Sequence, residues 1–78
     1  MDSILSARAE AIVIGLIRTG RASWQRVADG HIQLRAKRDS GFYWYWITAD
    51  GRLLRGDDLD RAEELQPKFV EAMVQAGH

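Results

Sequence analysis

The sequence predicts a single α+β domain, in which an N-terminal helix and a C-terminal helical region pack on a four-stranded antiparallel β-meander. Three observations carry this prediction. An alanine-rich segment with helical periodicity comes first, three glycine-containing turn signals follow at nearly even spacing, and an apolar segment after Pro67 is again helical in its periodicity. The 78 residues form one domain, 1–78, because two domains would each need a core of their own.

The first helix is expected from Ile4 to Arg18, capped by Asp2 or Ser3 and ended by Thr19-Gly20. Ile14 does not belong to its apolar stripe, so we expect either another element or an intermolecular contact to cover it. The β-branched residues of this run leave a strand as the alternative, because periodicity alone does not decide a short apolar segment. The stripe itself consists of Leu5, Ala9, Ile12, Val13, Leu16 and Ile17.

Three turn signals, at residues 28–30, 39–41 and 49–51, separate the segments that follow. Each ends in a glycine, which can adopt the positive φ that a three-residue hairpin loop with a bulge requires; Asp-Gly also suits two-residue turns. We therefore expect consecutive segments to pair as antiparallel strands. These strands are Ser23 to Val27, His31 to Arg38, Phe42 to Thr48 and Arg52 to Arg55.

An acidic cluster opens the second helical region. Asp57, Asp58 and Asp60 lie where the dipole of a helix favours negative charge. Pro67 would break or kink a continuous helix, but it suits the first residue of a new helix capped near Gln66. We expect a short helix, a bend at Pro67, and a final helix packed on the sheet through Phe69, Val70, Met73 and Val74.

The aromatic strand sets the two faces of the sheet. If residues 39–41 form a three-residue loop, Trp44 pairs with Ala36 and Trp46 pairs with Leu34. Phe42, Trp44 and Trp46 then join the core, where Trp24 meets them. A shift of one residue would exchange the faces. It would bury the two tyrosines of this strand and expose its two tryptophans, and such exposure would require a partner.

The second face supplies the candidate interaction surface, which Ile14 of the first helix extends. Tyrosines beside arginines and lysines are common on solvated sheet faces and are also enriched at protein interfaces. The same residue types can stack bases and neutralise phosphates. All three interpretations stay open at this stage. The strand residues of this surface are Arg35, Lys37, Tyr43, Tyr45, Ile47, Leu53 and Arg55.

The formal net charge is zero, but the two halves of the chain differ in sign. Residues 1–38 have four more basic than acidic groups, and residues 39–78 have four more acidic than basic groups. Such polarity suits an acidic partner or a head-to-tail contact between two copies. A net charge of zero argues against a protein that binds nucleic-acid backbones.

No motif predicts an enzyme, a cofactor or a metal site. Cysteine is absent, which excludes disulfides and thiolate-bound metals. His31 and His78 are the only histidines and do not form a ligand pair, and the acidic cluster after Gly56 does not match a calcium-binding loop. The longest aliphatic run, residues 11–17, is much shorter than the roughly 20 residues of a membrane-spanning helix.

We therefore expect a cytoplasmic, non-enzymatic protein-interaction or regulatory module without a cofactor. Its partner would be a protein or a second copy of itself, since a core of this size rarely supplies more than about 3–5 kcal/mol and a homodimer would add to it. We expect no membrane partner. The alternative is a nucleic-acid-binding module that uses Arg35, Lys37, Tyr43, Tyr45 and Arg55.

Overall fold

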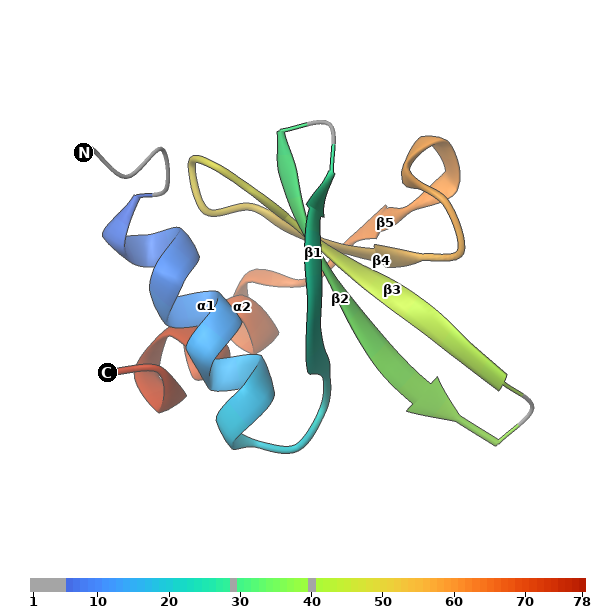
Figure 1. Cartoon of the computed structure of the whole chain (residues 1–78). Helices are drawn as coiled ribbons and strands as arrows, with labels where there is room; N and C mark the ends of the chain where they lie inside the picture. The colour runs from blue at the N-terminus through green and yellow to red at the C-terminus, as the bar shows by residue number, and fades with distance from the viewer. Residues whose placement is uncertain (1–5, 29, 40) are drawn as a thin grey trace.

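The computed structural model describes residues 6–28, 30–39 and 41–78, and it has an α+β fold in which two helices lie on one side of an antiparallel sheet (Figure 1). The strands follow the order β1-β2-β3-β4-β5, so each pairs with the next along the chain. The predicted meander is confirmed, and the short β5 adds a fifth strand. The elements are α1 (Ala7–Arg18), β1 (Ser23–Ala28), β2 (His31–Arg38), β3 (Gly41–Thr48), β4 (Leu53–Gly56), the 3₁₀ helix η1 (Leu59–Arg61), β5 (Glu63–Glu64) and α2 (Pro67–Ala76).

Helix α1 confirms the helical interpretation of the first segment. Its N-cap is Ser6, whose hydroxyl accepts a hydrogen bond from the backbone N–H of Ala9 at 3.0 Å. The caps expected at residues 2 and 3, and Leu5 of the apolar stripe, lie outside the described residues. The buried side of the helix includes Ile12 and Leu16, whereas Ile17, expected in the stripe, is largely exposed. Ile14 is exposed as well.

Helix α2 begins at Pro67 with Gln66 as its N-cap residue, as predicted. It crosses α1 at very short range, because glycine occupies the crossing point. A Cβ atom on Gly15 would lie 2.0 Å from the carbonyl oxygen of Met73. A second close approach joins Gly77 to the backbone of Ala11. The helices therefore pack backbone against backbone.

The segment between β4 and α2 is less helical than expected. It contains only the single turn η1, whose N-cap Asp58 accepts a hydrogen bond from the N–H of Arg61 at 3.2 Å. The chain then returns to the sheet, where β5 pairs with β4. The backbone N–H of Leu65 donates to the carbonyl of Leu53 at 3.0 Å, and Leu65 packs on the core. Pairing at the edge of the sheet therefore replaces part of the short helix that was expected before Pro67.

The register of β2 and β3 differs from the first prediction by one residue. Arg38 pairs with Gly41, so the connection is a two-residue loop at 39–40 and the prediction of a three-residue loop is wrong. Tyr45 consequently faces Leu34, and Ile47 faces Ile32. The alternative register, with its exchanged faces, is the one that forms.

Side-chain chemistry explains this choice. The observed register gathers four aliphatic side chains under the helices, those of Ile32, Leu34, Ile47 and Leu53, and each is at most 1% exposed. The other register would leave Ile47 and Leu53 in solvent. It would also bury two indole rings whose N–H groups need partners. The predicted meeting of Trp44 and Trp46 inside the core is therefore wrong.

The antiparallel pairing predicted between consecutive segments is confirmed on either side of this hairpin, although Ala28 pairs with His31, so the three-residue loop expected at 28–30 is wrong. Trp24 pairs with Leu34 across β1 and β2, and Trp46 pairs with Leu54 across β3 and β4. A β-bulge follows Trp24 and shifts the register of β1 before Arg26. Neither helix described here has the length and apolar character needed to cross a bilayer.

Candidate functional site: the open face of the sheet

The sheet face turned away from the helices carries four cross-strand rows of residues. Because Ile32, Leu34 and Ala36 of β2 point into the core, the residues that alternate with them point to the other face. In Figure 1 both helices lie on the core side of the sheet. We call the other side the open face. Its rows are Ala28–His31–Thr48, Arg26–Gln33–Trp46–Leu54, Ser23–Arg35–Trp44–Gly56 and Lys37–Phe42.

An aromatic stripe runs along β3 in the middle of the open face. Phe42 is 50% exposed, and Trp44 and Trp46 are partly exposed. The rings of Phe42 and Trp44 meet edge to face, with centroids 5.7 Å apart and an angle of 78° between their planes. The indole N–H of Trp46 donates to the carbonyl of Gly56 at 3.4 Å. These contacts fix the rings on the face.

Cationic side chains lie beside the stripe on β1 and β2. The guanidinium carbon of Arg35 lies 5.2 Å from the centroid of the Phe42 ring, within cation–π range. Arg26 donates from Nε to the side-chain oxygen of the buried Gln33 at 3.0 Å. A groove of about 400 Å³ lies between β1 and the end of the stripe, lined by Ser23, Arg35, Lys37, Gly41 and Phe42.

The sign of the charge changes along the stripe. Strands β1 to β4 contain no aspartate or glutamate, so every full charge at physiological pH in them is positive. At the Trp46 end, a second groove of about 490 Å³ is lined by η1 and contains Asp58, Asp60 and Arg61. The Phe42 end of the open face is therefore cationic, and its Trp46 end borders an acidic turn.

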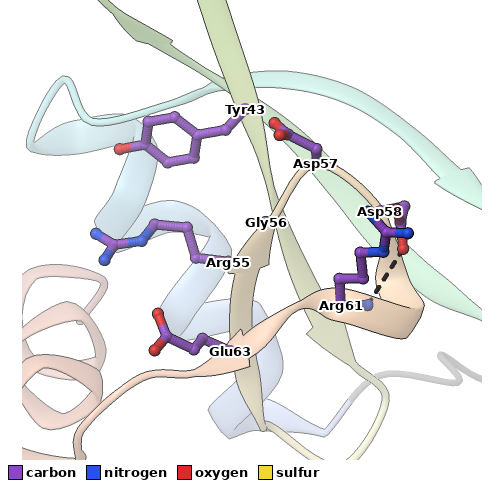
Figure 2. A pocket seen from close by; sticks show the side chains of 7 residues that line it. All are labelled: Tyr43, Arg55, Gly56, Asp57, Asp58, Arg61 and Glu63. Atoms are coloured by element: carbon purple, nitrogen blue, oxygen red, sulfur yellow. Dashed lines mark hydrogen bonds between the residues drawn. The ribbon is translucent and has the colours of Figure 1, made fainter.

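A cavity of about 590 Å³ lies at the junction of β3, β4 and η1 (Figure 2). Figure 2 shows Tyr43, Arg55 and Glu63 projecting to the same side, while Asp58 caps the backbone of Arg61. The guanidinium carbon of Arg55 is 5.8 Å from the centroid of the Tyr43 ring. Within the described residues, no group of three or more acidic or histidine side chains could hold a metal ion.

The structure divides the predicted surface between two faces. Arg35 and Lys37 lie on the open face, as predicted. Tyr45, Ile47 and Leu53 are buried under the helices and cannot form an open surface, which corrects their assignment. The remaining members also lie elsewhere: Tyr43 and Arg55 line the cavity of Figure 2, and Ile14 is exposed on α1.

The residues that replace them are Phe42, Trp44 and Trp46. The signal that would have found them is the length of the loop after β2, because a loop of two residues rather than three exchanges the side chains of β3 between the two faces of the sheet.

Burial also changes the ionisation of Tyr45. It raises the pKa of Tyr45 to about 12, with a further contribution from the neighbouring Tyr43 hydroxyl.

Comparison of the chain with protein-family models, curated proteins and solved structures found no match. The open face, with its aromatic stripe and its cationic flank, is therefore the feature from which a function can be inferred.

Proposed function

We propose that this protein is a non-enzymatic interaction module that binds a macromolecular partner across the open face of its sheet. The observation that carries the proposal is the aromatic stripe of Phe42, Trp44 and Trp46 on a face that neither helix covers. A small domain gains most of its stability by burying its largest aromatic side chains. Among the described side chains, the buried core consists of aliphatic residues, Met73 and Tyr45, with Tyr43 and Phe69 packed against it, and Phe42 is left half exposed.

The composition of the open face supports this function. Tryptophan, phenylalanine and arginine are enriched where proteins bind partners, and clustered exposed apolar groups mark such surfaces. Trp44 and Trp46 also lie where β3 is paired on both sides, and Phe42 lies where β3 pairs with β2, so the backbone of the stripe is held before a partner arrives. The contacts of Arg35 with Phe42 and of Trp46 with Gly56 restrict the side chains further. Such restriction lowers the entropy that binding costs.

Site-specific photocrosslinking tests the proposal. A benzophenone amino acid at position 42 places the crosslinker on the open face, and the same amino acid at position 17, which is 41% exposed on α1, provides a control of similar exposure. In lysate of the source organism, position 42 should give discrete crosslinked products that position 17 does not give. Trp44→Ala, introduced into the position-42 protein, should abolish them. Equal labelling at both positions would contradict the proposal.

A further inference from the structure

We infer that the open face binds single-stranded nucleic acid, an assignment that rests on the proposed function and names its partner. The first observation is charge. Arg26, Arg35 and Lys37 lie on this face, and the strands that build it carry no carboxylate. The carboxylates of the described residues lie in the helices, the turns and the η1–β5 segment. A net charge of zero therefore coexists with a local cationic surface suited to an anionic partner.

The second observation is the arrangement of cations and rings. Lys37 is directly opposite Phe42, and Arg35 is directly opposite Trp44. Each of these two rows therefore offers one aromatic and one positively charged side chain on neighbouring strands, whose backbones lie about 4.8 Å apart. A nucleotide presents the matching pair of groups, a base that stacks on rings and a phosphate that binds cations. An acidic peptide would use the cations and leave the rings without a partner.

The third observation is the distance between rows. Successive rows are two residues apart along β3, which corresponds to roughly 6.7 Å in a strand. This is about twice the 3.4 Å rise per nucleotide of a duplex strand. The rows therefore match an extended strand with separated bases rather than a stacked double helix. The acidic turn beside Trp46 further limits the path to the side of the face formed by β1, β2 and the Phe42 end of β3.

Fluorescence anisotropy with a short labelled oligothymidylate tests this inference. We expect a dissociation constant of about 10⁻⁴–10⁻⁶ M at physiological salt, typical of sequence-independent contacts, and tighter binding at low salt. Three phosphate contacts predict a slope of about −2 for log affinity against log salt. The affinity should accordingly fall roughly 15-fold between 50 and 200 mM salt. A duplex of the same length should bind more weakly than the single strand.

Three variants of the open face and one control on α2 separate the contribution of this face from that of the rest of the molecule. Trp44→Ala should weaken binding by roughly tenfold or more through lost stacking, and Trp44→Phe should restore part of the affinity. Arg35→Gln should weaken binding and reduce the salt slope by about 0.7. Lys68→Gln removes an exposed charge from α2, on the helix side, and should leave the affinity unchanged. Circular dichroism of each variant verifies that it is folded.

The outcomes distinguish this inference from the proposed function. Absence of oligonucleotide binding at low salt, or binding that the open-face variants do not change, would overturn the nucleic-acid assignment. Equally tight, Trp44-dependent binding of a polyglutamate peptide would also overturn it, while leaving the open face as the interaction surface. The interaction surface itself fails only if position 42 gives no specific crosslink.

Discussion

At the scale of single residues, neighbours on β3 have opposite environments. Tyr45 is 3% exposed beneath the helices, whereas Phe42, three residues earlier, is half exposed on the other face. Burial disfavours the tyrosinate anion, and the Tyr43 hydroxyl adds to the effect, so the pKa of Tyr45 rises from 10.0 to about 12. The pKa of Tyr45 therefore reports which face of β3 lies under the helices.

Titration of Tyr45 gives the first prediction. A Tyr43→Phe variant leaves Tyr45 as the only tyrosine, and its tyrosinate absorbance should appear clearly above pH 10 in the folded protein, because burial, the largest cause of the raised pKa, remains. In the unchanged protein, the folded state keeps the Tyr45 proton up to a pKa of about 12, whereas the unfolded state releases it near pH 10. Stability is therefore fully present below pH 10 and falls between pH 10 and 12, by on the order of 2 kcal/mol. A midpoint near pH 10 in the folded protein would contradict the buried position.

A second variant isolates this contribution from other groups that titrate at high pH. Tyr45→Phe keeps the ring and removes the ionisable hydroxyl. We expect its free energy of unfolding, measured with urea between pH 9 and pH 12, to fall less with rising pH than that of the unchanged protein. The difference between the two proteins is the contribution of Tyr45.

At the scale of the elements, the contact between α1 and α2 depends on the absence of a side chain at Gly15. The backbone of Met73 occupies the space that a Cβ atom would need. Thr19 continues the same contact: its hydroxyl donates to the carbonyl of Gly15 at 2.8 Å, and its Oγ1 lies 3.8 Å from the Met73 sulfur. Arg18 donates to the carbonyl oxygens of Ala76 and His78 at the end of α2. The contact between the helices therefore combines a close approach of the two backbones with hydrogen bonds from Arg18 to backbone carbonyls.

Gly15→Ala gives the second prediction. In an exposed helix, this change would stabilise the protein by up to about 1 kcal/mol through helix propensity. Here it should lower the free energy of unfolding by about 2 kcal/mol or more, because the helices must separate to admit a methyl group. The reverse change at an exposed position of α2, Ala72→Gly, should cost only about 1 kcal/mol. Chemical denaturation of both variants would measure the difference, and a stabilised Gly15→Ala protein would contradict the observed crossing.

At the same scale, some features of the elements could be predicted from the sequence and others could not. The start of α2 at Pro67 and the turns between strands could be predicted, because proline and glycine act through local backbone geometry. The register of β3 could not be decided, because both faces of this strand are apolar or aromatic and loops of two or three residues suit the same glycine. Arg35 and Lys37 were therefore placed correctly, while Tyr45 was assigned to the wrong face.

At the scale of the whole molecule, the two faces of the sheet have different surroundings. The helices cover the side that contains Ile32, Leu34 and Ile47, and the aromatic stripe lies on the side that they leave open. Figure 1 also shows β2 and β3 extending beyond the helices, so the end of the stripe that contains Phe42 lies at the periphery. The protein therefore combines a closed aliphatic core with an open cationic and aromatic surface.

The assignment of these faces is the central claim, and two alanine variants of one strand test it most directly. Tyr45→Ala should lower the free energy of unfolding by about 3–5 kcal/mol, enough to unfold a marginally stable domain. Phe42→Ala should cost about 1 kcal/mol, because its ring is half exposed and loses mainly its contact with Arg35. Urea unfolding of the two proteins should therefore find Tyr45→Ala far less stable than Phe42→Ala. The reverse order would place Phe42, Trp44 and Trp46 in the core and contradict the open face.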